Sequence, residues 1–70
     1  MPIVNVKLVE GAFSDDQKRK LLEGITDAVE TAYPGLRDVT FVTIEETQAW
    51  SIAGDQITKE KVAKHAQQAG

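Results

Sequence analysis

The stretch Ser14–Ala32, SDDQKRKLLEGITDAVETA, decides the fold because it has the pattern of one long amphipathic helix. Ser14 is a typical N-cap residue, and Gln17 three positions later completes a capping box. The helix would be roughly 28 Å long at the usual rise per residue. Tyr33-Pro34-Gly35 ends it, since proline cannot continue a helix and glycine favours its end. The apolar residues at helical spacing are Leu21, Leu22, Ile25, Ala28, Val29 and Ala32.

The segments on either side of this helix alternate as strands do. PIVNVKLV, residues 2–9, places Val4, Val6 and Leu8 on one face. DVTFVTIEE, residues 38–46, has apolar or β-branched residues on both faces. Strand, helix and strand in this order predict a βαβ unit with parallel strands and a right-handed crossover.

The remaining residues add only short elements. TQAW reads as a loop, SIAG (51–54) as a short strand or turn, and TKEKVAKHAQQ (58–68) as a short helix capped by Thr58. The predicted fold class is therefore α/β (α+β), with a single βαβ unit, a short C-terminal strand and a helix. We expect one domain over residues 1–70, since 70 residues are too few for two.

Composition excludes several classes of protein. Without cysteine there are no disulfides or thiolate metal sites, and the single histidine, His65, has no ligand spacing around it, so no metal site is predicted. A net charge of −3 without a basic stripe argues against nucleic-acid binding. No apolar run approaches the ~20 residues of a membrane span, and no signal peptide is expected, since Asn5 and Lys7 interrupt the first apolar stretch. The absence of cysteine fits a cytoplasmic location.

A chain this small needs support from a second copy. A domain of about 60 residues buries only about 60% of the surface of its unfolded chain. The second strand has two faces to bury, yet the sequence offers one long helix to cover them. We therefore expect a homo-oligomer in which another subunit covers the open face, with Val4, Val6, Val42 and Ile44 as candidates for burial.

Four segments in this order resemble the 4-oxalocrotonate tautomerase family: MPIVNVKLVEG, SDDQKRKLLEGITDAV, VTFVTIEE and WSIAG. The resemblance covers nearly the whole chain. It implies a tautomerase-like β-α-β fold, a homohexamer built as a trimer of dimers, a small-molecule substrate and no cofactor.

The resemblance gives Pro2 a chemical role. By itself, proline at this position is a typical first residue of a strand. In the family the initiator methionine is removed, so that the ring nitrogen of the proline becomes a free secondary amine and acts as general base. Burial and nearby positive charge lower the pKa of such an amine toward neutrality, where a general base works best. While Met1 is attached, that nitrogen is an amide and the mechanism is blocked.

The substrate-binding residues depart from the family pattern. Family members carry an arginine after the EG turn and a second arginine on the second strand, both of which hold substrate carboxylates. Here Ala12 and Phe13 follow the turn, and Thr40 occupies the second position. Arg37, three residues upstream of Thr40, is a candidate for supplying charge, although a solvated loop arginine is the commoner case.

Trp50 matches the family position of an aromatic wall beside the proline, and tryptophan is also enriched at subunit interfaces. Glu45 and Glu46 should point to opposite faces of a strand, so they are not expected to share a proton. One of them is a candidate for activating water, as in hydratase- or dehalogenase-like relatives, against the plain alternative of a solvated strand end. Lys7 reads as a solvated strand lysine, and His65 as exposed in the C-terminal helix.

Two hypotheses follow. In the first, the chain is a cofactor-independent tautomerase that interconverts keto and enol forms, or shifts a double bond, of a small 2-keto or enol acid. Pro2 is the base, and the substrate lies among Phe13, Arg37, Thr40 and Trp50. In the second, motivated by the absent arginines, the chain is a non-catalytic or partner-dependent subunit of a mixed oligomer.

Overall fold

A computed structural model of the chain describes residues 1–69. The strands are β1 (Ile3–Val9), β2 (Phe41–Thr47), β3 (Trp50–Ile52) and β4 (Asp55–Ile57). The helices are α1 (Asp15–Ala32), the one-turn 3₁₀ helix η1 (Arg37–Val39) and α2 (Lys59–Ala69). No helix among these residues is long and apolar enough to cross a membrane.

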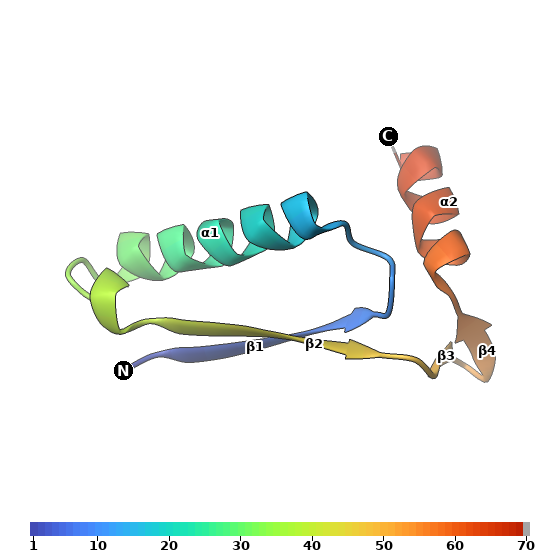
Figure 1. Cartoon of the computed structure of the whole chain (residues 1–70), viewed down its shortest axis with the longest axis horizontal. Helices are drawn as coiled ribbons and strands as arrows, with labels where there is room; N and C mark the ends of the chain where they lie inside the picture. The colour runs from blue at the N-terminus through green and yellow to red at the C-terminus, as the bar shows by residue number, and fades with distance from the viewer. Residues whose placement is uncertain (70) are drawn as a thin grey trace.

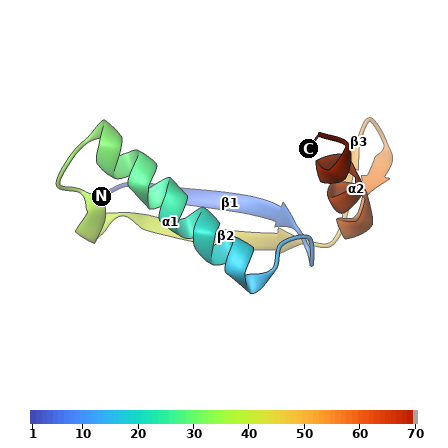
Figure 2. The ribbon, with the colours of Figure 1, turned by 90° about the horizontal axis from the view of Figure 1, so that it is seen from above.

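The predicted βαβ unit is confirmed. β1 and β2 pair in parallel, with Ile3 opposite Phe41 and Val9 opposite Thr47, and α1 lies along one face of the pair (Figures 1 and 2). At the start of α1 the Ser14 hydroxyl accepts from the Gln17 N–H at 3.2 Å, and the Gln17 side chain accepts from the Ser14 N–H at 2.8 Å. The predicted capping box is therefore present.

The second strand begins later than the sequence indicates. Residues 38–40 were expected in the strand, but Asp38 and Val39 belong to η1 and the strand begins at Phe41. The hydrogen bond from the Val39 N–H to the Leu36 carbonyl, 3.1 Å long, closes a turn in place of a sheet contact. The prediction of a strand from Asp38 was wrong for these first residues.

The C-terminal part contains one strand more than expected. SIAG is the centre of a hairpin in which Trp50 pairs with Ile57 and Ile52 with Asp55. Ala53 and Gly54 form its turn with φ of 53° and 82°, both left-handed, as a type I′ turn requires. The predicted C-terminal helix is confirmed as α2, where the Thr58 hydroxyl accepts from the Lys61 N–H at 3.3 Å.

Burial alternates along both strands and identifies the covered face. Val4, Val6, Val42 and Ile44 are half-buried. Glu46, on the same face as Val42 and Ile44, contacts Lys18 of α1, so this face lies beneath α1. The four valines and isoleucines proposed for burial thus face their own helix, not the open side of the sheet. The open face presents Ile3, Asn5 and Lys7 from β1 and Phe41, Thr43 and Glu45 from β2.

One chain forms no closed core. Among residues 1–68 no hydrophobic side chain is fully buried, while Ile3 is 72% and Phe41 51% exposed. The radius of gyration is 14.4 Å. A compact domain of this length has about 11 Å. The hairpin and α2 extend beyond the end of the sheet (Figure 1), which explains this elongation.

Glu46 connects three segments at the end of the sheet. Its carboxylate lies 3.1 Å from the Lys18 ammonium and accepts a 3.3 Å hydrogen bond from the Gly11 N–H. The Lys18 hydrogen bond, followed by that from Gly11, holds the pKa of Glu46 below its ordinary value of 4.5. The β1–α1 turn is therefore attached both to α1 and to β2.

We predict that Ser14→Ala lowers the free energy of unfolding by about 1 kcal/mol, because the Gln17 N–H loses its acceptor. Urea unfolding at one fixed protein concentration measures this. Ser14→Asp keeps an acceptor and should unfold close to the wild type. Equal losses in the two variants would contradict a capping role.

We further predict a pH dependence from Glu46. A carboxyl whose pKa falls on folding stabilises the protein above its unfolded pKa and loses that contribution as pH falls through the folded value. The stability difference between wild type and Glu46→Gln should therefore be present at neutral pH and be lost as the pH falls below 4.5 and through the lowered pKa of Glu46. It should also be small and salt-sensitive, since both side chains of the pair are partly exposed to solvent. Urea titrations from pH 7 to 3 test this, with Glu45→Gln on the opposite face as control.

Candidate active site

Pro2 lies half-buried at the edge of the sheet where both β1 and β2 begin. Its carbonyl accepts a hydrogen bond from the Phe41 N–H at 2.9 Å. Proline has no N–H, so the carbonyl is its only backbone group that can join the sheet. The ring nitrogen takes no part in that bond. It is an amide while Met1 is attached and becomes a secondary amine once Met1 is removed.

Thr40 immediately precedes Phe41 and therefore lies at the same edge as Pro2. Its hydroxyl donates to the Leu36 carbonyl at 2.7 Å, and its N–H donates to the Arg37 carbonyl at 3.3 Å. The hydroxyl proton is thus used within the chain. The oxygen keeps its capacity as acceptor.

Arg37 belongs to the same edge, in η1. Its guanidinium forms an ion pair and hydrogen bond with Asp27 of α1. The Asp27 hydrogen bond is the main reason that the pKa of Arg37 is raised, and Glu30 and Asp38 add to it. Arg37 therefore brings a permanent positive charge to the Pro2 edge, but one that Asp27 already engages.

Trp50 and Phe13 lie at the opposite end of the sheet. Trp50 begins the hairpin that follows β2, and Phe13 lies in the loop between β1 and α1 (Figure 1). Seven-residue strands span roughly 20 Å, so neither side chain adjoins Pro2 of its own chain. The Trp50 Nε1 atom is buried and has no hydrogen-bond partner among the described residues.

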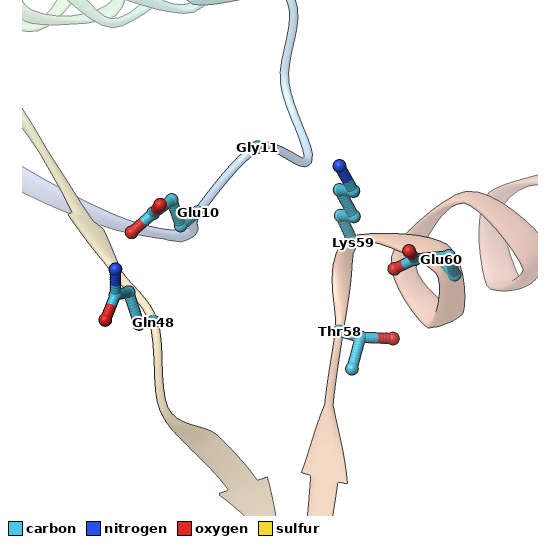
Figure 3. Close-up of a pocket in the computed structure, with 6 residues that line it drawn as sticks. All are labelled: Glu10, Gly11, Gln48, Thr58, Lys59 and Glu60. Atoms are coloured by element: carbon cyan, nitrogen blue, oxygen red, sulfur yellow. The ribbon is translucent and has the colours of Figure 1, made fainter.

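Two hollows also lie at that opposite end. One, of about 290 Å³, is drawn in Figure 3, where Glu10 and Gln48 lie on one side of a gap bordered by Gly11, and Thr58, Lys59 and Glu60 lie on the other side. The other, of about 330 Å³, is lined by Ala12, Phe13 and Gln17 on one side and by Val62, Ala63 and Ala66 of α2 on the other. Neither contains Pro2. Within one chain the five predicted site residues are therefore divided into Pro2, Arg37 and Thr40 at one end and Phe13 and Trp50 at the other.

The remaining titratable candidates lie apart from Pro2. Glu45 and Glu46 point to opposite faces, as expected, with Glu46 toward Lys18 and Glu45 on the open face. Lys7 is exposed and opposite Glu45 in the strand register. His65 is exposed on α2, as predicted. Among residues 1–69 no group of three or more His, Cys, Asp or Glu side chains is arranged to hold a metal ion.

Asp27 and Glu30 contact the loop beside Pro2, and sequence reasoning missed both. Asp27 binds the Arg37 side chain, and Glu30 accepts backbone hydrogen bonds from Gly35 and Arg37. A signal was present. Acidic residues near the C-terminus of a helix oppose the helix dipole, so their occurrence there suggests a specific partner.

Comparison with known proteins gives consistent results. The family model described as tautomerase enzyme matches residues 2–60. A probable tautomerase of Staphylococcus aureus is 46% identical over 56 residues, which cover 77% of this chain and 90% of that protein. A probable tautomerase of Staphylococcus haemolyticus is 45% identical over 56 residues, covering 77% and 89%.

Solved structures agree with the sequence matches. A putative 4-oxalocrotonate tautomerase from methicillin-resistant S. aureus superposes with a TM-score of 0.68 at 43% identity, covering 84% of this chain and 94% of that one. A structure from a study of 4-oxalocrotonate tautomerase isozymes of Methylibium petroleiphilum has a TM-score of 0.71 at 30% identity, covering 99% and 100%. With the parallel βαβ unit and a proline at its sheet edge, these matches show that the chain belongs to the tautomerase family.

Proposed function

We propose that the protein is a cofactor-independent tautomerase in which Pro2, freed by removal of Met1, moves a proton between carbon and oxygen of a small 2-keto or enol acid. The observation that carries the proposal is the position of Pro2. It stands second in the chain, half-buried, with its carbonyl fixed by Phe41 and its ring nitrogen free of the sheet bonds.

The surroundings of Pro2 suit a base that works near neutral pH. Partial burial of Pro2 disfavours the protonated amine and so favours the neutral form that acts as a base. The amine would remove a proton from the carbon beside the carbonyl and return it to another position. Both transfers need one group that changes protonation state easily at the working pH.

The substrate we propose is a monocarboxylate or a neutral enone. Family members hold two substrate carboxylates with arginines at the positions where this chain has Ala12, Phe13 and Thr40. The nearby Arg37 is already paired with Asp27. One partly neutralised guanidinium fits a single carboxylate or carbonyl better than a dicarboxylate. Enolic phenylpyruvate, an apolar monocarboxylate, is a suitable assay substrate.

We propose further that a complete site is shared between copies of the chain. Trp50 and Phe13 are separated from Pro2 of the same chain by roughly the length of a strand, so they reach a proline only if another chain supplies it. The open sheet face, with Ile3 and Phe41 exposed, gives the chain a reason to associate. A homohexamer arranged as a trimer of dimers is the assembly we expect.

A second candidate is a partner-dependent subunit of a mixed oligomer. The engagement of Arg37 by Asp27 favours it, since such a chain would need an arginine from elsewhere. Native mass measurement separates the two candidates. A stable homo-oligomer with activity that depends on Pro2 contradicts the partner-dependent reading.

We predict that Pro2→Ala lowers kcat/KM for enolic phenylpyruvate at least 100-fold, because the secondary amine that acts as base is lost. Alanine at position 2 also permits removal of Met1, so both the wild type and the variant begin at residue 2 with a free amine. Intact mass must first show that Met1 is absent from both proteins. Full activity in Pro2→Ala, or none in methionine-free wild type, would contradict the proposal.

We also predict complementation between two impaired variants. Trp50→Ala should lower kcat/KM about tenfold through loss of an aromatic contact. When Trp50→Ala and Pro2→Ala chains are unfolded together and refolded, some sites should combine an intact Pro2 with an intact Trp50. The activity of the mixture should then exceed the sum of its separately refolded parts. Strict additivity would place Trp50 outside any shared site.

A further inference from the structure

We propose that Glu30 is a positioning residue for Pro2, acting through the loop that joins α1 to β2; this rests on the proposed role of Pro2 as base. Glu30 is half-buried near the end of α1. Its Oε2 atom accepts hydrogen bonds from the Gly35 N–H at 3.2 Å and from the Arg37 N–H at 3.1 Å, and Oε1 lies 3.3 Å from the same Gly35 nitrogen. A single carboxylate therefore holds both sides of Leu36.

The Glu30 carboxylate stabilises the turn at residues 35–37, whose backbone N–H groups need an acceptor. Gly35 has a φ of +97°, in the left-handed region, whereas the next residue, Leu36, has a φ of −100° and caps η1. The backbone therefore changes conformation abruptly between these two residues. The N–H groups of Gly35 and Arg37 would otherwise have no acceptor in the adjoining helix. Hydrogen bonds from backbone N–H to a charged carboxylate are about twice as strong as those between neutral groups.

From this turn a short series of hydrogen bonds leads to Pro2. The carbonyls of Leu36 and Arg37 accept from the hydroxyl and the N–H of Thr40, at 2.7 and 3.3 Å. The next residue, Phe41, donates its N–H to the Pro2 carbonyl at 2.9 Å. Figure 1 shows the α1 end, η1 and the N-terminus at the same end of the molecule.

The last bond of this series matters because Pro2 has few other supports. The pyrrolidine ring holds its nitrogen in a fixed position on Cα, so the direction of that nitrogen relative to the sheet depends on ψ, which the carbonyl hydrogen bond sets. Once Met1 is removed, no residue precedes Pro2 to hold it. A displacement of about 1 Å at a reacting group can cost about 100-fold in rate. Loosening the Glu30 turn should therefore reduce proton transfer more than substrate binding.

The location of Glu30 supports a specific role. A negative charge in the final turns of a helix is unfavourable by the helix dipole. Glu23 lies two turns earlier on the same helix face and is exposed. It provides a matched control for any change in charge or helix propensity.

The test separates the reach of the side chain from its charge. Glu30→Asp keeps the charge but shortens the side chain, while Glu30→Gln keeps an acceptor oxygen at the same reach. We expect Glu30→Asp to lower kcat at least about fivefold with KM within about twofold. Glu30→Gln should lower kcat less than Glu30→Asp does, because its amide oxygen keeps the reach but forms weaker hydrogen bonds than the carboxylate. Glu23→Asp should behave as wild type. Amide hydrogen exchange of Phe41 should accelerate at least about tenfold in Glu30→Asp, with mid-strand amides unchanged.

Each other outcome overturns the proposal. Unchanged Phe41 exchange in Glu30→Asp means that Glu30 does not hold this bond. Faster exchange with unchanged kcat means that the bond does not position the base. An equal loss of kcat in Glu30→Gln and Glu30→Asp means that the length of the side chain, which lets it accept hydrogen bonds from Gly35 and Arg37, does not determine the activity. If methionine-free wild type shows no activity that depends on Pro2, the proposed function fails, and the Phe41 exchange still reports on Glu30 separately.

Discussion

The rest of the structure depends on one constraint: two parallel strands beneath a single helix cannot enclose a core. α1 covers the face that carries Val4, Val6, Val42 and Ile44, yet even these residues remain half-buried. The other face exposes Ile3 and Phe41 beside polar neighbours, including a hydrogen bond from Asn5 to the Thr43 hydroxyl at 2.6 Å. A two-stranded sheet is marginal by itself, and the association proposed above would supply the burial that one chain lacks.

The same topology divides the candidate site. Parallel strands begin at one edge, which places Pro2 next to Thr40 and η1, and they end at the other edge, where the hairpin with Trp50 follows. No change in side-chain conformation brings the two groups together within a chain, because the length of the sheet lies between them. If catalysis needs both, folding, assembly and activity become parts of a single equilibrium.

Features set by interactions between neighbouring residues were mostly predicted correctly from the sequence, and features set by contacts between distant residues were mostly not. The capping box of Ser14 and Gln17 and the strand alternation are local patterns, and both were confirmed.

The start of β2 was misplaced because the carboxylate of Glu30, several residues away, holds the turn that precedes η1. Strand β4 was missed because Ala53 occupies a left-handed position where asparagine or glycine is usual, so the turn signal was weak. The family resemblance pointed to Pro2, Thr40 and Arg37 as site candidates, but the pairing of Arg37 with Asp27 depends on tertiary contacts that no short sequence pattern reports.

That pairing bears on what the Pro2 edge can recognise. Arg37 is surrounded by Asp27, Glu30 and Asp38, all of which favour its charged form. A substrate carboxylate approaching this arginine must compete with Asp27 or accept the guanidinium protons that Asp27 leaves free. An arginine with five N–H donors can serve both, although the net field that the substrate meets is weaker than that of an unpaired cation. The acids that hold the loop in place thus also reduce the attraction for a second negative charge, so that the proposed positioning of Pro2 and the proposed preference for a singly charged substrate would have a common origin.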